Sequence, residues 1–273
     1  MRTFGTEKNY AVWDDKVTET LLWERTTGTQ FPINPDEVMP RYLKEQEEQK
    51  SRTDNKAEVF TPYEIIEKMN DMVEEDYAER ALYIKRKVLE VTCGEAPYLT
   101  TRYDAATGVE IPVEKRLGLL DRKLKCIPKE IGKELYSLCV SEALKATYGY
   151  EWQYDSLFLA RRNLLMTSIE HFESVWGAEP NYLDVLSWAH IISYNIFRMD
   201  GVSMCLPLTQ TPALVMNWEE GKIERFDGKD LALYHQNRIP CLLSSGGLLC
   251  AVFNFHPTKR QKILTCFTSA QYR

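Results

Sequence analysis

The sequence predicts an α/β fold with a parallel sheet, because three short apolar segments alternate with amphipathic helices over residues 61–201. The segments 87–91, 146–152 and 195–199 are the expected strands, and an acidic residue lies at or just beyond the end of each. Strands and helices that alternate along a chain favour parallel strands with helices covering the sheet.

Composition and charge limit the class of protein. The 273 residues are 44% hydrophobic and 27% charged, which is typical of a globular chain. The net charge of −6 argues mildly against nucleic acid, although a local basic stripe on an acidic protein would still allow it. The seven Cys form no CxxC pair, so we expect reduced thiols in a cytoplasmic protein. Segment 1–16 lacks an apolar core and no stretch approaches 18 apolar residues, so we expect neither a signal peptide nor a membrane span.

The N-terminal part, residues 1–57, is polar with scattered aromatic residues and is expected to form a helical extension. Within it, 39–50 is predicted as an exposed helix and 51–56 as a flexible basic join. The main domain is expected over 58–237. It is followed by an atypical tail, 238–273, which contains no Asp or Glu.

The main domain is predicted to begin with a helix at residues 61–62. Thr61 suits the N-cap, Pro62 the first helical position, and Glu64 completes a capping box. After the first strand, a turn of small residues leads into 101–128, which is interpreted as an insertion with a charged segment. The remaining helices are expected over about 129–147, 155–175 and 181–193.

Acidic residues at the strand ends are the first candidates for a ligand site. Glu90, Glu151 and Asp200 follow the three expected strands, and the carboxyl ends of parallel strands meet at one edge of a sheet. An adenosine ligand needs a tight turn beneath it, an acid for its ribose hydroxyls and a polar group for its adenine amine. Each acid also has a structural alternative: Glu90 as a satisfied strand-end carboxylate, Glu151 as a helix N-cap or surface group, and Asp200 as part of an Asp-Gly turn.

Four short motifs in order resemble those of the amino-group DNA methyltransferases. Segment 57–62 (AEVFTP) resembles the Phe-Thr-Pro motif of that family, and 89–94 (LEVTCG) resembles its first cofactor motif. Segment 148–151 (YGYE) with 160–165 is similar to the second motif, and 195–201 to the third. The likeness spans roughly residues 9–225 and is to restriction-system methylase subunits M. It implies a Rossmann-like, S-adenosylmethionine-dependent methyltransferase sheet, incomplete here.

The resemblance also implies a cofactor and partners. S-adenosyl-L-methionine would be the cofactor, DNA the substrate, and a restriction or specificity subunit a further partner. The implied cofactor residues lie in the Phe-Thr-Pro motif, the first turn and the two later strand ends: Phe60, Thr61, Pro62, Glu90, Thr92, Cys93, Gly94, Glu151 and Asp200. We expect no metal site, since the four His are scattered without ligand spacing.

Two departures from the family pattern matter. The second Gly of the first motif is replaced by Ala96, which leaves less room beneath a ligand. The catalytic tetrapeptide, Asn/Asp/Ser-Pro-Pro-Tyr/Phe, whose residues hold the target amine and stack on the flipped base, is absent. The nearest run is 254–257 (NFHP), which is more readily interpreted as a loop, so the catalytic residues are unknown.

The leading hypothesis is therefore a site-specific DNA adenine-N6 methyltransferase of a restriction-modification system, or its cofactor-binding N-terminal part. A non-catalytic, methyltransferase-like binding subunit of a restriction or defence complex is the alternative. A third class, a metal-dependent nuclease, is suggested by Pro35-Asp36 with Glu48 and Lys50. That chemistry needs carboxylates on adjacent strands around a metal, whereas Glu48 lies in a helix-like run.

Overall fold

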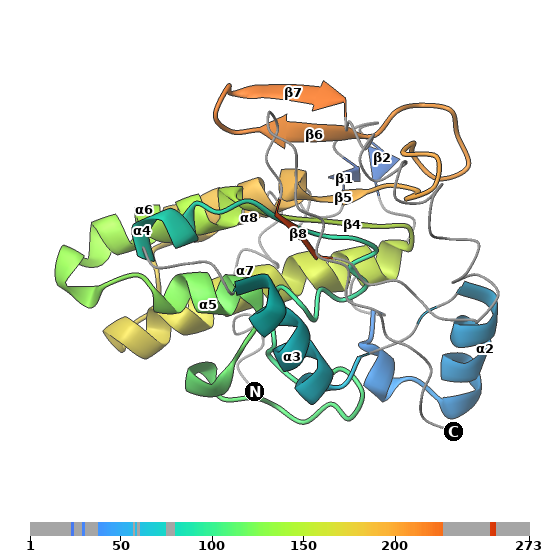
Figure 1. Ribbon diagram of the computed structural model, residues 1–273, viewed down its shortest axis with the longest axis horizontal. Coiled ribbons are helices and arrows are strands. Elements are labelled where there is room, and N and C mark those ends of the chain that lie inside the picture. Colours follow the sequence, from blue (N-terminus) through green and yellow to red (C-terminus); the bar gives the residue numbers. More distant parts are fainter. Residues whose placement is uncertain are drawn as a thin grey trace.

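The computed structural model describes residues 23–24, 29–30, 38–56, 58, 61–74, 80–225 and 252–254, and the structural statements below concern these residues. They form a mixed α/β fold with seven α-helices and a sheet that contains three parallel strands (Figure 1). The predicted α/β class is confirmed at this level. The proposed division of the chain at residues 57 and 237 stays a prediction.

The three predicted strands form the parallel part of a four-stranded sheet. They are β3 (Val88–Glu90), β4 (Thr147–Glu151) and β5 (Ile196–Arg198), in the order β5-β4-β3. A fourth strand, β8 (Val252–Asn254), pairs antiparallel with β3. Two antiparallel pairs lie outside this sheet: β1 (Trp23–Glu24) with β2 (Thr29–Gln30), and β6 (Leu214–Asn217) with β7 (Lys222–Arg225).

The helices connect and cover the parallel strands. The α-helices are α2 (Gln46–Lys56), α3 (Tyr63–Glu74), α4 (Arg80–Ile84), α5 (Leu119–Lys125), α6 (Lys133–Lys145), α7 (Tyr154–Trp176) and α8 (Tyr182–Asn195). Short 3-10 turns occur at Arg41–Leu43, Val113–Lys115 and Lys129–Ile131. Asn181 caps α8 by accepting a hydrogen bond from the Asp184 N–H, and Gly177 ends α7 in the left-handed conformation. Within the described ranges, no helix combines the length and apolar character that a membrane span requires.

Two predicted local features at the N-terminal end are wrong. Residues 51–56 are not a flexible join but the second half of α2, which buries Arg52 against the rest of the molecule. The helix after it begins at Tyr63, whose backbone N–H donates to the Asp104 carboxylate at 2.9 Å. Thr61 does not provide that cap, since its hydroxyl accepts a hydrogen bond from the Tyr98 hydroxyl at 3.1 Å. A carboxylate from a distant loop therefore replaces the local cap that the sequence suggested.

The segment interpreted as an insertion, 101–128, contains the buried helix α5. Leu119, Leu120 and Leu124 are buried in the main core, although Asp121, Arg122, Lys123 and Lys125 make the helix look solvent-exposed in sequence. A helix looks solvent-exposed in sequence when its charged side chains bond to partners inside the protein. The interpretation of 114–125 as only a charged segment is therefore wrong.

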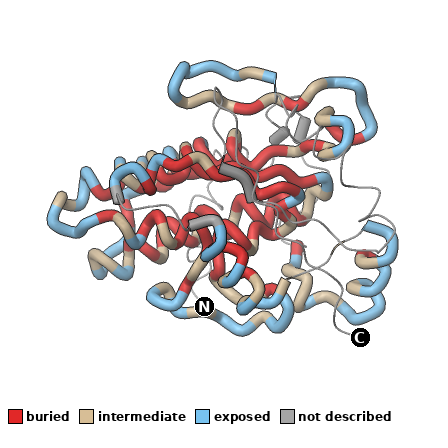
Figure 2. The backbone as a smooth tube through the Cα atoms, viewed as in Figure 1, coloured by how far each residue is buried: buried red, intermediate tan, exposed pale blue. Residues whose placement is uncertain are grey.

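The two faces of the sheet are covered differently. Val88 and Ile196 belong to the large core formed with α5, α6, α7 and α8. The alternate strand residues Leu89, Tyr148 and Phe197 belong to a smaller cluster that Ala213 and Val215 complete. The β6–β7 hairpin lies on the other side of the strands from α5 and α7 (Figure 1), and burial is greatest in the strands and surrounding helices (Figure 2). This alternation is the period-two pattern of a sheet buried on both faces.

A buried lysine joins elements at the amino end of the parallel strands. The Lys123 ammonium nitrogen donates to the carbonyl oxygens of Arg86 at 2.6 Å and Ala146 at 2.9 Å, and lies 3.1 Å from the Thr147 hydroxyl. Its side chain has no solvent exposure. Burial, with a smaller contribution from the Arg86 charge, lowers the pKa of Lys123 well below its usual value.

We therefore expect Lys123→Met to change how stability depends on pH. An unfolded chain keeps this lysine protonated up to about its usual pKa of 10.5, whereas the folded chain releases the proton at lower pH. Between these two pKa values the unfolded state binds more protons, so the unfolding free energy of the wild type rises with pH, by up to about 1.4 kcal/mol per pH unit. Urea unfolding from pH 7 to 10 should show the wild type gaining stability relative to Lys123→Met. Lys85→Met, an exposed lysine, is the control, and a difference that does not change with pH would contradict the prediction.

Candidate functional site

The carboxyl ends of β3 and β4 bring several of the predicted ligand residues together. The turn after β3 is tied to β4 because the Cys93 N–H donates to the Tyr150 carbonyl at 2.8 Å. The Gly94 N–H donates to the Glu151 carboxylate, also at 2.8 Å. Cys93 is buried, and a Cβ atom on Gly149 would lie 3.1 Å from its sulfur. The turn therefore packs closely on the neighbouring strand.

Glu151 is the most connected acid at this edge. One carboxylate oxygen accepts from the Trp152 and Gln153 N–H groups at 2.8 and 2.9 Å, and the other from Gly94. Burial raises the pKa of Glu151, the three N–H groups oppose this, and the nearby Glu58 charge adds to the increase. An ionised carboxylate has about four acceptor positions, so about one is left for a ligand hydroxyl. The N-cap alternative for Glu151 is wrong, because Trp152 and Gln153 both precede α7, whose N-cap residue is Gln153 and whose first turn has no side-chain cap.

Glu90 is a strand-end carboxylate whose hydrogen bonds are satisfied within the protein, which is the structural alternative considered for it. Its side chain has no solvent exposure, and its two oxygens accept from the Tyr98 and Leu99 N–H groups at 3.4 and 3.2 Å. Burial raises the pKa of Glu90 well above its usual value, and the charge of Glu151 contributes in the same direction. Glu90 therefore positions the end of the turn rather than facing a ligand.

The Phe-Thr-Pro segment joins this edge through a tyrosine. The Tyr98 hydroxyl donates to the Thr61 hydroxyl, while the Tyr98 backbone N–H bonds Glu90. Pro62 is exposed just before α3, and Phe60 lies outside the described residues. Thr61 and Glu90 are thus linked by one shared residue, Tyr98.

The turn itself adopts an unusual backbone. Thr92, Gly94 and Ala96 have φ angles of 51°, 55° and 63°, in the left-handed region. Ala96 stands where the family motif has its second Gly, and a non-Gly residue in this region costs about 1–2 kcal/mol. A Cβ atom on Gly94 would meet no atom within 4 Å, so space lies beside the turn at that residue. Held strain of this kind is common where a backbone is shaped for a ligand.

The Asp200 carboxylate forms hydrogen bonds within the turn that it begins. Its carboxylate accepts from the Val202 N–H at 2.9 Å and from the Ser203 hydroxyl at 2.7 Å. A Cβ atom on Gly201 would lie 2.7 Å from the Tyr150 hydroxyl, so glycine is required there. This geometry matches the Asp-Gly turn alternative. It leaves each Asp200 oxygen with one further acceptor position.

The structure also contains a connection at this edge that sequence reasoning missed. The Glu95 carboxylate accepts from the Arg41 backbone N–H at 2.8 Å and from the Tyr103 hydroxyl at 2.5 Å. The Asn163 side-chain amide donates to the Glu95 carbonyl oxygen at 2.9 Å. Burial raises the pKa of Glu95, which is almost fully enclosed. These contacts bring the segment before α2 against the turn after β3, and no local pattern could have revealed them.

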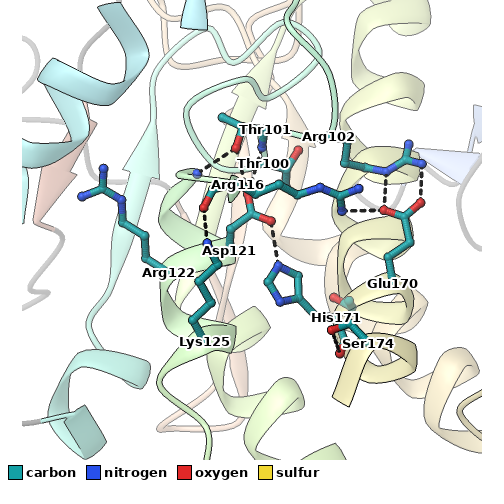
Figure 3. Close-up of polar contacts among 12 residues, drawn as sticks. Thr100, Thr101, Arg102, Arg116, Asp121, Arg122, Lys125, Glu170, His171 and Ser174 are labelled. Atoms are coloured by element: carbon teal, nitrogen blue, oxygen red, sulfur yellow. Dashed lines mark hydrogen bonds and ion pairs between the residues drawn. The ribbon is translucent and has the colours of Figure 1, made fainter. Parts of the chain in front are cut away.

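A second buried polar cluster lies between α5 and α7 (Figure 3). Asp121 accepts from the Thr101 N–H at 2.9 Å, and its other oxygen lies 2.9 Å from His171 Nε2. Asp121 and His171 are both buried, so this pair orders the segment between β3 and α5 and does not meet substrate. Partners 50 positions apart give no signal in sequence.

Glu170, next to His171, extends this ordering role. It pairs with Arg102 at 2.6 and 3.0 Å and with Arg116 at 2.5 Å (Figure 3). The two guanidinium groups hold the pKa of Glu170 below its usual value despite burial. Both ends of the segment 102–116 are therefore fixed to one residue of α7.

The register of β8 corrects the interpretation of Asn254, whereas 255–257 lie outside the described residues. Asn254 is the last residue of a strand and not part of a loop. Because β8 is antiparallel to β3, Asn254 lies opposite Val88 while Val252 lies opposite Glu90. Asn254 is thus at the amino end of β3, away from Glu90 and Glu151, and does not stand in for a catalytic residue at the carboxyl edge.

The nuclease hypothesis is not supported by the described geometry. Glu48 and Lys50 lie on α2, which is helical, whereas Pro35 and Asp36 lie outside the described residues. In the part of the chain that the structure describes, no three His, Cys, Asp or Glu side chains gather as metal ligands would. This chemistry requires carboxylates on adjacent strands, and Glu48 does not supply one, because it lies on a helix.

Comparison with known protein families, with curated proteins and with solved structures finds no match for this chain.

Glu90→Gln tests the buried carboxylate at the end of β3. An unfolded glutamate ionises near its usual pKa of 4.5, whereas folded Glu90 keeps its proton to higher pH. Between these pKa values the folded state binds more protons, so the unfolding free energy of the wild type falls as pH rises, by up to about 1.4 kcal/mol per unit.

We expect Glu90→Gln to remove this fall, so that the variant gains stability relative to the wild type between pH 5 and pH 8. Urea unfolding at several pH values measures the difference, with Glu64→Gln, an exposed position on α3, as the matched control. Parallel pH curves for the wild type and Glu90→Gln would show that Glu90 does not carry the effect.

Proposed function

We propose that the carboxyl edge of the sheet binds S-adenosylmethionine, and that the chain is the cofactor-binding part of a DNA adenine-N6 methyltransferase. The observation that carries this proposal is the hydrogen bond from the Gly94 N–H to the Glu151 carboxylate. It sets a glycine-containing turn directly against an acid on the neighbouring parallel strand. An adenosine ligand requires these two features side by side.

Three further observations support the same ligand. Glu151 keeps about one acceptor position after its three backbone contacts, which is suited to a ribose hydroxyl. Space adjoins Gly94, and Ala96 takes the left-handed conformation that the replaced Gly would adopt. Thr61 is linked to the same turn through Tyr98. DNA as substrate rests on the motif resemblance alone.

In this proposal the residues of the chain have distinct roles. Glu151 accepts hydrogen bonds from the ribose, and the turn 92–96 passes beneath the sugar and the sulfur. Glu90 holds that turn through Tyr98 and Leu99, and so positions it without touching ligand. The bound cofactor would supply an electrophilic methyl group.

The non-catalytic subunit is the second candidate, and one observation favours it. The strand next to β3 is antiparallel, and its register sets Asn254 at the amino end of β3. No described strand therefore carries a base-holding residue to the carboxyl edge beside Glu90. If purified protein transfers labelled methyl groups to DNA, this second candidate is excluded.

Calorimetry with S-adenosylmethionine tests the cofactor site. Charge-assisted hydrogen bonds contribute roughly 1.5–3 kcal/mol, so we expect Glu151→Ala to weaken binding at least about tenfold, or ~1.4 kcal/mol. No binding by the wild type would overturn the proposal.

A ligand pair separates contact with the ribose from a loosened turn. We expect the wild type to bind 5′-methylthioadenosine more tightly than its 2′-deoxy analogue, and Glu151→Ala to bind the two equally. If Glu151→Ala weakens both ligands by the same factor, Glu151 acts only by ordering the turn.

A further inference from the structure

A buried guanidinium at the edge of the proposed site has an unused donor. Arg52 lies on α2, and its Nε donates to the Glu58 carboxylate. Its Nη1 pairs with the Asp155 carboxylate at 2.7 Å. In the described part of the chain Nη2 has no hydrogen-bond partner, although Arg52 is only 8% exposed. An unsatisfied buried donor costs about 1–3 kcal/mol, so a group that completes it would be stabilising.

Arg52 lies at the same edge of the sheet as the proposed ligand site. Asp155 is in the first turn of α7, four residues after Glu151. The Glu58 carboxylate that Arg52 contacts is near enough to raise the pKa of both Glu95 and Glu151. Figure 1 shows α2 at the end of the molecule where β4 leads into α7. The guanidinium thus borders the turn and the acid to which we assign the adenosine.

The charged groups at this edge suit a ligand that carries both positive and negative charges. Glu58, Glu95 and Glu151 lie at this edge beside the cations Arg52 and Lys44, and carboxyl groups of this kind suit the sulfonium and ammonium groups of S-adenosylmethionine. The same acids disfavour its one anionic group, the methionine carboxylate. That carboxylate therefore needs a cationic partner, and a guanidinium with a spare N–H is well suited to it.

We propose that Arg52 donates from Nη2 to the methionine carboxylate of the bound cofactor, and so determines specificity for an adenosine that carries an amino acid. This inference rests on the proposed function. Because Nη2 is enclosed, the carboxylate reaches it only when α2 separates from α7. The Arg52–Asp155 pair and the Lys44–Asp155 pair at 3.0 Å are two contacts between α7 and the segment that carries Arg52 that this opening would loosen.

Calorimetry with two ligands tests the assignment. S-adenosylmethionine and decarboxylated S-adenosylmethionine share the adenosine and the sulfonium, and only the first has the carboxylate. We expect the wild type to prefer S-adenosylmethionine at least about tenfold, the ratio that one charge-assisted hydrogen bond gives. Arg52→Met should reduce this ratio to near one while its affinity for the decarboxylated ligand stays within about twofold.

Control variants separate recognition from the structural role of Arg52. Asp155→Asn breaks the same ion pair but keeps the donor, and Lys50→Met changes an exposed residue on the same helix; both should retain the wild-type ratio. If Arg52→Met does not fold, Arg52→Gln, which keeps a polar side chain without the charge, should show the same loss. A tenfold preference that persists in the folded Arg52 variant overturns this inference alone. Failure of the wild type to bind either ligand overturns the proposed function together with it.

Discussion

The carboxylate of Glu151 accepts hydrogen bonds from Gly94, Trp152 and Gln153, which belong to the turns that follow two different strands. Its position at the end of β4 means that both turns are fixed relative to one rigid element. The other contacts at this edge build outward from that arrangement. Glu90 fixes the far end of the first turn, and Glu95 joins this turn to the segment before α2. Without an acid at 151, backbone N–H groups from both turns would be left without acceptors.

The two ends of the parallel strands have opposite chemical character. At the amino end, the Lys123 ammonium nitrogen binds the carbonyl oxygens of Arg86 and Ala146, and Asn195 donates to the carbonyl of Leu144. At the carboxyl end, acids accept from backbone N–H groups. Strand and helix ends have backbone N–H and C=O groups without partners in regular secondary structure, and these side chains form hydrogen bonds with them. Backbone N–H groups are thus bound by acids at one edge, and backbone carbonyl groups are bound by Lys123 and Asn195 at the other.

Sequence reasoning succeeded where the signal is local. The strands around Val88, Tyr148 and Phe197 and the long helix α7 were predicted to within a few residues, because their patterns extend over several consecutive positions. It failed where a distant partner decides the structure. Asp104 caps α3 and Asp121 pairs with His171, although in both cases the two partners are far apart in the chain. For the candidate site, the turn and Glu151 were brought together as predicted, whereas the enclosure of Glu90 depends on its three-dimensional surroundings.

The antiparallel strand β8 has a consequence for how the sheet is assembled. β3, β4 and β5 come from one stretch of chain and can pair as soon as that stretch is synthesised, whereas β8 joins β3 from far along the sequence. Closing so long a loop is slow, so the nascent domain passes through a period in which the outer edge of β3 is unpaired. An unpaired edge of apolar residues is a template for other chains. Until β8 has been synthesised and has paired with β3, this edge is therefore open to strands of other chains.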